Sequence, residues 1–342
     1  MRIVDFRSDT VTKPTQEMRE AMYRAEVGDD VYEEDPTVRR LEELGAARTG
    51  FEAGLFVASG TMGNLVALLT HTQKGDEVFL EEQSHIYYYE VAGLAALAGV
   101  LPRLIPAKRG LLTPQLIKEY YRPANIHYPN PALLCLENTH NRGGGSVMRP
   151  QEMAGLVETA RELGLKIHVD GARIFNAAVA CECDVRELTK GADSVQLCLS
   201  KGLAAPMGSL LVGSADFIRK ARKYRKMVGG GFRQIGIMAA AGIVALEKMV
   251  DRLAEDHRLA AKLAGGLAET GYLHVKSEEV ETNMVVAYLN TERIDAANFV
   301  VQLAEAGIKI NAYGGNRLRF VTHKDINEDD IEYALKVIAK LA

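Results

Sequence analysis

The lysine at position 201 follows a short apolar stretch, which makes it a candidate for chemistry. Val195, Leu197 and Leu199 alternate with other residues, as is typical of a buried strand. A lysine at the end of such a strand must be paired, exposed to water or neutralised, because an unpaired buried ammonium is unfavourable. A desolvated lysine loses its proton more easily and becomes a nucleophile that forms Schiff bases. The alternative is a structural lysine whose amine reaches solvent past the strand end.

A carboxylate ends another apolar stretch earlier in the chain. Ile167 and Val169 predict a buried strand that ends at Asp170. A carboxylate there needs a partner, and Arg173 is a local candidate. Asp170 is therefore either half of a structural ion pair with Arg173 or the acidic group of a binding site.

The turn at 59–64, Ser-Gly-Thr-Met-Gly-Asn, lies between an apolar strand and an apolar helix. Free N–H groups and the dipole of a helix N-terminus attract anions, and Gly60 and Thr61 stand at that point. The turn matches neither the P-loop nor the G-x-G-x-x-G pattern, so a nucleotide is not indicated. The structural alternative is a plain strand-to-helix turn capped by Thr61.

His85 comes shortly after a further apolar strand at 77–80. Open α/β sheets bind ligands beyond the carboxyl ends of their strands. A Schiff-base lysine, a carboxylate for a ring nitrogen, a contact for the ring face and an anion-binding turn are what pyridoxal phosphate needs. These residues therefore predict pyridoxal phosphate as the cofactor, with Asp170 keeping its ring an electron sink.

Alternating strand and helix patterns must position these groups. Strand candidates at 101–105, 132–136 and 208–213 continue the alternation, and a helix is expected from Pro150. This alternation predicts an α/β fold with its site at the strand ends. The uncharged run at 235–246 predicts a helix that is buried in the core or in a subunit interface.

The pattern changes after residue 250. Two helices flank strand candidates at 283–289 and 317–322, which we interpret as a βαβ-type segment. We therefore expect an N-terminal arm and large cofactor-binding domain over 1–250 and a small α/β domain over 251–342. Arg317 and Arg319 share one face of the last strand, which is either half-exposed or holds an arginine over a substrate carboxylate.

Composition narrows the class of protein. The 342-residue chain has a formal net charge of -4, which favours neither nucleic acid nor an anionic membrane as a partner. It has no apolar run of membrane-spanning length, and its N-terminus lacks the apolar core of a signal peptide, so we expect a cytoplasmic protein. The four cysteines lack zinc-type spacing, and no metal site is predicted.

The sequence resembles a known family nearly from end to end, the low-specificity L-threonine aldolases. The segments that carry the resemblance are 6–12, 28–32, 59–64, 137–141, 168–173, 199–202 and 229–234. The resemblance implies the aspartate aminotransferase fold, fold type I of the pyridoxal-phosphate enzymes. That fold has a large domain with a mostly parallel seven-stranded sheet between helices and a smaller α/β C-terminal domain.

The resemblance also implies a role for each matching residue. Lys201 resembles the lysine that holds the cofactor, Asp170 resembles the partner of the pyridine nitrogen, and His85 resembles the histidine stacked on the ring. Gly60 and Thr61 resemble phosphate contacts. The other implied cofactor contacts are Arg173, Lys226 and Arg233, of which Arg233 is expected from a partner chain.

Substrate contacts are implied in the same way. Ser8, Arg173 and Arg319 resemble the clamp on the amino-acid carboxylate, and Tyr32 is expected at the substrate site. His127 resembles a histidine that reaches the substrate hydroxyl from a neighbouring subunit. The expected assembly is therefore a homo-oligomer, a dimer with shared active sites that assembles into a tetramer.

Two positions depart from the family pattern. Phe232 stands where methionine is expected, and Glu33 stands where glycine is expected, so the loop around Glu33 is expected to sit differently.

The predicted activity is retro-aldol cleavage of L-threonine, L-allo-threonine and related β-hydroxy-α-amino acids into glycine and an aldehyde. It would run through the Lys201 Schiff base and a quinonoid form of glycine, with His85, His127 or a water as the base. Three alternatives remain: another pyridoxal reaction such as β-elimination or transamination, a cofactor-binding regulator without turnover, and a cofactor-free lysine aldolase. The sequence leaves open the preference between threonine and allo-threonine, the identity of the base, and dimer or tetramer.

Overall fold

A seven-stranded sheet forms the centre of the large part of the molecule. The computed structural model describes residues 2–290 and 294–341, and within them the strand order is β2-β8-β7-β6-β5-β3-β4. The strands are β2 (Ala53–Val57), β3 (Glu77–Glu81), β4 (Leu101–Ile105), β5 (Pro131–Glu137), β6 (Lys166–Asp170), β7 (Ser194–Cys198) and β8 (Ser209–Gly213). All neighbouring pairs are parallel except those that β8 makes with β2 and β7. The predicted mostly parallel α/β sheet is confirmed.

The antiparallel orientation of β8 follows from the short connection between β7 and β8. Residues 199–208 join β7 to β8 without a helix, whereas a parallel strand needs a long crossover. Apart from the edge strand β4, the other strands are largely buried on both faces and are mainly apolar, as strands covered by helices must be. The loop that carries Lys201 is therefore the short link between two adjacent strands.

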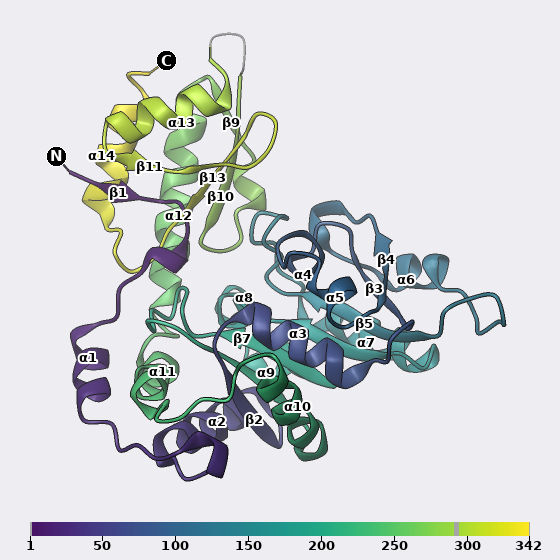
Figure 1. Ribbon diagram of the computed structural model, residues 1–342. Helices are drawn as coiled ribbons and strands as arrows, with labels where there is room; N and C mark the ends of the chain where they lie inside the picture. Colours follow the sequence, from purple (N-terminus) through teal and green to yellow (C-terminus); the bar gives the residue numbers. More distant parts are fainter. Residues whose placement is uncertain (1, 291–293, 342) are drawn as a thin grey trace.

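Helices cover both faces of this sheet (Figure 1). On one face, α3 (Gly60–His71) and α10 (Ala215–Met227) pack on Leu55, Val57 and Leu211. The other face is covered in part by α2 (Pro36–Thr49), α7 (Pro150–Glu162) and α11 (Gly236–Lys248). The remaining helices of this part are α1 (Gln16–Tyr23), α4 (His85–Tyr88), α5 (Gly93–Ala96), α6 (Pro114–Tyr120), α8 (Ile174–Ala180) and α9 (Val185–Thr189), with 3-10 turns η1 (Asp9–Val11), η2 (Asp30–Tyr32) and η3 (Lys108–Gly110).

The apolar helix expected at 235–246 is α11. Its residues from Ala239 to Leu246 are all buried, and it packs between α1 and α2 within the single chain. It is therefore a core helix, as an all-round apolar surface requires.

The C-terminal part has its own sheet and its own core. Its four-stranded sheet has the order β12-β13-β10-β9, with antiparallel pairs throughout. The strands are β9 (Leu273–Val275), β10 (Met284–Leu289), β12 (Asn311–Ala312) and β13 (Arg317–Val321); the helices are α12 (Leu253–Ala268), α13 (Ala296–Glu305), α14 (Glu328–Ile338) and the 3-10 turn η4 (Ser277–Glu279). The expected βαβ-type segment is wrong in one respect, because β10 and β13 are antiparallel. The short strands β11 (Ile308–Lys309) and β12 come between α13 and β13 and reverse the chain.

The N-terminal arm joins the two parts. Strand β1 (Val4–Asp5) pairs in parallel with β11, and Val4 and Phe6 lie in the C-terminal core. The chain then runs from the C-terminal part to α1 on the large part (Figure 1). The domain boundary at 250/251 stays a prediction, and the structure adds that the first strand packs with the smaller part.

Candidate active site

Lys201 lies just beyond β7, half-buried, in the link to β8. Its carbonyl oxygen accepts a hydrogen bond from Thr12 Oγ1 at 2.9 Å, so the N-terminal arm holds this loop. The positive charge of Lys201 helps to lower the pKa of Asp9 and opposes protonation of His85. The amine therefore lies in the electrostatic neighbourhood of both side chains.

Asp170, at the end of β6, is held by an amide. Asn64 Nδ2 donates to Asp170 Oδ2 at 2.8 Å, and the backbone N–H of Ala172 donates to Oδ1 at 3.1 Å. The structural pair with Arg173 that the sequence offered as an alternative does not form. Asp170 keeps free lone pairs on a buried carboxylate, as a partner for a protonated ring nitrogen must.

Arg173 is instead paired with Asp9 in the N-terminal arm. Its Nε and Nη2 donate to the two carboxylate oxygens at 2.7 and 2.5 Å, and both side chains are buried. Burial opposes ionisation of Asp9, but the charge and hydrogen bonds of Arg173 outweigh it and hold the pKa of the carboxyl well below its usual range. Asp9 was missed in the sequence, although its segment was singled out, because its partner is distant along the chain.

His85 begins α4 and contacts a second carboxylate. Its Nδ1 lies 2.8 Å from Glu90 Oε1, which also accepts from Asn64 Nδ2 at 2.8 Å. Burial disfavours the imidazolium, but Glu90 and the charge of Asp170 outweigh it and raise the pKa of His85. Asn64 and Glu90 were not predicted as site residues. Asn64 lies at the end of the anion-binding turn that the sequence did single out.

The predicted phosphate turn lies against β7. The helix cap is Ser59, whose Oγ accepts from Met62 N at 3.2 Å, and not Thr61. A Cβ at Gly60 would stand 3.0 Å from Cys198 Sγ, so the glycine lets the start of α3 approach the strand that leads to Lys201. Thr61 is exposed on the first turn of α3, where N–H groups lack intrahelical partners.

Lys226 lies near this turn within the same chain. It sits at the end of α10, and a Cβ at Gly231 would be 2.5 Å from its Nζ. The neighbouring Gly230 approaches Met62 of α3, where a Cβ would be 3.0 Å from the Met62 sulfur. The Gly-Gly-Gly loop thus brings a lysine to the anion-binding end of α3.

Arg319 is buried on β13 with part of its guanidinium unused. Nη1 donates to Asn141 Oδ1 at 2.8 Å, and Nη2 donates to the carbonyl oxygen of Arg7 at 2.9 Å. Its buried Nε has no partner among the described residues. Ser8 lies next to that contact and caps η1 by accepting from Thr10 N at 3.2 Å.

Three predicted site residues are not brought to this cluster within one chain. His127 is exposed in the loop before β5, and Tyr32 is 71% exposed on η2. Arg233 is exposed and pairs with Asp29 at 2.9 Å. Their roles stay predictions, and those of His127 and Arg233 assume a second copy of the chain.

The residues present fit the predicted cofactor. Buried polar atoms without a partner among the described residues include Ser84 Oγ and Gln196 Oε1, on segments next to His85 and to Gly60. Buried polar groups are nearly always satisfied, so these two atoms are open to a bound group with its own donors and acceptors. His85, Glu90 and Asp170 have three atoms of metal-ligand type within 4.8 Å of one another. Asn64 already donates to both carboxylates, so the cluster is accounted for by hydrogen bonds and we assign no metal to it.

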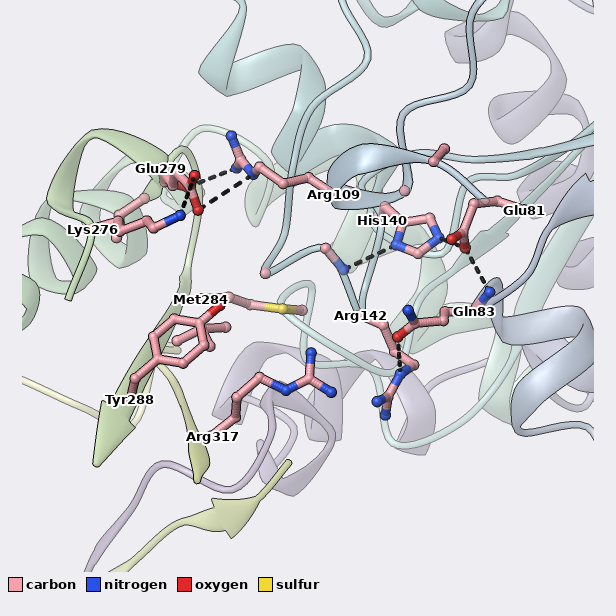
Figure 2. Close-up of a pocket in the computed structure, with 16 residues that line it drawn as sticks. Glu81, Gln83, Arg109, His140, Arg142, Lys276, Glu279, Met284, Tyr288 and Arg317 are labelled. Atoms are coloured by element: carbon pink, nitrogen blue, oxygen red, sulfur yellow. Dashed lines mark hydrogen bonds and ion pairs between the residues drawn. The ribbon is translucent and has the colours of Figure 1, made fainter. Parts of the chain in front are cut away.

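A neighbouring pocket borders this cluster between the two parts of the molecule (Figure 2). Arg317 reaches into it from β13, and Arg142 reaches into it from the loop after β5. Arg142 also lies 4.9 Å from the ring centre of Tyr313, the same separation as that of Arg319 from this ring. None of the predicted site residues lines this pocket.

Fold and site together define a class. The seven-stranded sheet with a small C-terminal part, a lysine after β7 and an acid at the end of β6 are those of fold type I of the pyridoxal-phosphate enzymes. The fold matches a threonine aldolase from Leishmania major with a TM-score of 0.84 at 19% identity, over 98% of this chain and 99% of that one. It also matches SPT with PLP as internal aldimine, with a TM-score of 0.76 at 17% identity, over 99% and 87%.

The family follows from the sequence comparisons. The chain belongs to the beta-eliminating lyase family, whose model matches residues 5–290, and within it to the low-specificity L-threonine aldolases. It is 45% identical to low-specificity L-threonine aldolase 1 of Arabidopsis thaliana, over 98% of this chain and 95% of that protein. It is 44% identical to the low specificity L-threonine aldolase of Escherichia coli K12, over 96% of each. Among the described residues, no helix is long and apolar enough to cross a membrane.

Proposed function

We propose that this chain is an L-threonine aldolase, an aldehyde-lyase that depends on pyridoxal phosphate. It would cleave L-threonine, L-allo-threonine and related β-hydroxy-α-amino acids into glycine and an aldehyde, which is acetaldehyde for threonine. The main support is the placement of Lys201 just beyond β7 and of the buried Asp170 at the end of the neighbouring strand β6. The chain is also 45% identical to a relative of that name.

The residues would divide the work by position. Lys201 would hold the cofactor covalently, and Asp170 would accept a hydrogen bond from its ring nitrogen. His85 would cover the ring, while the start of α3, with Gly60 and Thr61, would hold the phosphate. When bound, the cofactor supplies an electron sink for the bond that breaks.

Arg319 is the strongest candidate for the substrate carboxylate. Its buried, unpartnered Nε is a donor that a carboxylate satisfies. Ser8 lies next to Arg7, whose carbonyl oxygen contacts Arg319. Arg173 would join Ser8 and Arg319 if its guanidinium binds the substrate carboxylate as well as Asp9. Fixing the carboxylate would orient the substrate so that the bond from Cα to Cβ is the one that breaks.

Breaking that bond requires a base for the β-hydroxyl proton. As this proton leaves, the oxygen forms the carbonyl group of the aldehyde, and Cα later regains a proton to give glycine. The proposed base is His85, His127 of a neighbouring copy of the chain, or a water that either histidine holds. Tyr32 and Arg233, both exposed in one chain, would complete the site across a dimer, and two dimers would form the tetramer.

An assay of products tests the reaction. Purified protein incubated with L-threonine should release glycine and acetaldehyde in equal amounts. Lys201→Ala should lose both the turnover and the absorbance of the covalently held cofactor. A variant that keeps both would remove Lys201 from its role.

β-Elimination is the second candidate, favoured by the name of the matched family. It would release ammonia and a keto acid from amino acids that carry a leaving group on Cβ. Incubating the protein separately with L-serine and with L-threonine distinguishes the two reactions, because only an aldolase releases glycine from both amino acids. Keto acid and ammonia as the main products would favour elimination.

Mixed oligomers test the shared site. If position 127 serves the neighbouring chain, co-expressing Lys201→Ala with His127→Ala gives some sites that have both residues intact. Activity should then reappear in the mixture although each variant alone is weak. No recovery in mixed dimers would place each site within one chain. The cytoplasmic location stays a prediction.

A further inference from the structure

A row of buried and partly buried hydrogen bonds leads from Asp170, at the carboxyl end of β6, to Ser194, at the start of β7, and to His71 of α3. Asn64 Nδ2 donates to Asp170 Oδ2 at 2.8 Å, and Asn64 Oδ1 lies 3.0 Å from His168 Nε2. His168 Nδ1 lies 2.8 Å from Ser194 Oγ, which lies 2.8 Å from His71 Nε2. The row passes between α3, β6 and β7, which pack together.

The two carboxylates fix which way the amide of Asn64 points. Its two N–H groups face Asp170 Oδ2 and Glu90 Oε1, and a carboxylate only accepts hydrogen bonds. Turning the amide over would place its oxygen against both carboxylates. The oxygen of Asn64 therefore faces His168, and His168 must donate from Nε2.

The proton on Nε2 in turn fixes the rest of the row. A neutral imidazole has one donor and one acceptor, so Nδ1 of His168 accepts from the hydroxyl of Ser194. That hydroxyl has given its only hydrogen, and its oxygen accepts from Nε2–H of His71. Burial lowers the pKa of His168 to about 4 and that of His71 to about 2, so both rings are neutral near pH 7. Each bond in the row thus has a single consistent direction.

His168 could undo this order if its proton moved. With the proton on Nδ1, its Nε2 would accept, and the oxygen of Asn64 would lose its donor. The amide could then turn over and present its oxygen to Asp170. A buried carboxylate facing another acceptor would take up a proton or shift its position, and it would no longer hold a protonated ring nitrogen.

We propose that His168 is a positioning residue for the cofactor, which acts through Asn64 to keep Asp170 an accepting carboxylate, with Ser194 and His71 locking the ring of His168 in the form protonated on Nε2. The inference rests on the proposed function, because it concerns the same cofactor site. Neither His168 nor Asn64 is expected to touch the substrate. Their effect should therefore fall on cofactor affinity and on the state of the bound ring.

The first test needs no cofactor chemistry. Full-length protein carrying nitrogen-15 histidine, with and without pyridoxal phosphate, is examined by long-range proton–nitrogen spectra, with His168→Gln and His71→Gln giving the assignments. His168 and His71 should both be neutral and protonated on Nε2 between pH 6 and 8. A cationic His168, or one protonated on Nδ1, would overturn the proposal.

The second test removes the donor. His168→Leu deprives Asn64 of its partner, whereas His168→Gln keeps an N–H donor within reach. After removal of the cofactor, His168→Leu should bind pyridoxal phosphate about 10- to 100-fold more weakly than the unaltered chain, the ratio expected for one hydrogen bond to a buried charge. His168→Gln should recover most of the affinity, and the pH dependence of the bound cofactor's absorbance should shift only in His168→Leu.

A matched control separates positioning from general loss of packing. Thr189→Val removes another buried hydrogen bond, that of Thr189 Oγ1 to the carbonyl oxygen of Thr49 at 2.8 Å. It should lower stability without changing cofactor affinity. A folded His168→Leu that binds the cofactor as tightly as the unaltered chain would refute positioning and leave the proposed function standing.

The remaining outcomes are also decisive. If the unaltered chain itself fails to bind pyridoxal phosphate, the proposed function fails, while the histidine spectra still test the hydrogen-bond row. If His168→Leu does not fold, those spectra and the affinity of His168→Gln decide the matter. In that case either result would reject the proposal: a His168→Gln variant that binds the cofactor weakly, or spectra in which His168 is not protonated on Nε2.

Discussion

At the scale of single residues, the pair between Asp9 and Arg173 ties the N-terminal arm to the site. Both side chains are buried, and the pair is bidentate. A buried ion pair adds little net stability, yet removing one partner leaves an uncompensated charge. Its position beside Lys201 and Arg319 means that the arm is held by the same charges that would meet substrate.

Replacing Asp9 by asparagine should therefore destabilise the protein strongly. We expect Asp9→Asn to lower the free energy of unfolding by about 3–5 kcal/mol at pH 7, because Arg173 stays buried without its partner. The lowered pKa of Asp9 means that its contribution is complete above about pH 4 and is lost as the pH falls further. Urea unfolding measures both effects.

An exposed pair is the control for Asp9→Asn. Asp216 and Arg219 are 77% and 68% exposed, so Asp216→Asn should change stability by less than about 1 kcal/mol. Equal losses in the two variants would contradict the role given to the buried pair.

Glu90 should set the pH at which His85 can act as a base. Glu90 helps to raise the pKa of His85, so a base at His85 becomes available only as the pH rises above its ordinary value of about 6.5. In Glu90→Gln the acidic limb of the profile of kcat/KM against pH should move to lower pH. An unmoved limb would assign the base to another group, such as His127 or a water.

Residues that act through distant partners are those that the sequence hides. Lys201 and Asp170 could be predicted because each ends a buried strand, where a charge stands out. Asp9 and Asn64 could not, since their partners Arg173 and Asp170 lie 164 and 106 positions away. Glu90 lies near His85 along the chain, but the sequence does not show that the two side chains meet inside the fold. Only the folded chain shows which of many polar residues are buried together.

At the scale of elements, the start of α3 depends on two glycines that let it lie against β7. A Cβ at Gly63 would stand 2.6 Å from Cγ of Gln196, which is closer than side chains pack. Gly63→Ala should therefore push α3 from the sheet and lower the free energy of unfolding by about 1–3 kcal/mol. It should also weaken pyridoxal phosphate binding, because the phosphate turn moves with the helix.

A helical glycine with open space around it is the control for that substitution. Gly265 in α12 has nothing within 4 Å of an added Cβ. Gly265→Ala should stabilise by about 0.5–1 kcal/mol through helix propensity alone. Thermal unfolding of both variants measures the difference, and a stabilising Gly63→Ala would contradict the close approach of α3.

Element types were predictable where periodicity is strong, and less so where turn geometry decides. The apolar strands and the core helix α11 were foreseen from their patterns. The antiparallel pairing of β10 with β13 was not, because the two-residue strands β11 and β12 that reverse the chain carry no pattern. Glu33, which departs from the family's glycine, has φ 59°. A left-handed conformation explains why glycine is favoured there.

At the scale of the whole molecule, the candidate site combines segments that belong to two separate hydrophobic cores. The large core carries Lys201, Asp170 and His85, while the C-terminal core carries Arg319 and the first strand of the arm. The α/β class followed from alternation along the chain. How the arm crosses between the cores could not be foreseen, because Val4 and Phe6 resemble any apolar residues until their partners are known.

Histidines that are neutral inside the fold, His168 fully buried and His71 and His257 partly buried, should make the whole fold sensitive to mild acid. Burial lowers the pKa of His71 to about 2 and those of His168 and His257 to about 4. The unfolded chain takes up protons near pH 6.5, whereas the folded chain does not. Stability should therefore fall as the pH drops from 6.5 toward 4, by about 1.4 kcal/mol per pH unit for each such histidine.

Two histidines in the C-terminal part, His257 and His274, test whether partly buried neutral histidines cause this acid sensitivity. His257 accepts a hydrogen bond from Asn176 at 3.2 Å through Nε2, as a neutral ring does, whereas His274 is exposed. In urea unfolding between pH 4.5 and 6.5, His257→Gln should reduce the slope of stability against pH by about one proton, and His274→Gln at an exposed position is the matched control. His85 does not disturb this window, because a raised pKa stabilises below pH 6.5 and is lost only as the pH rises through it. Equal slopes in both variants would mean that His257 is protonated in the folded chain.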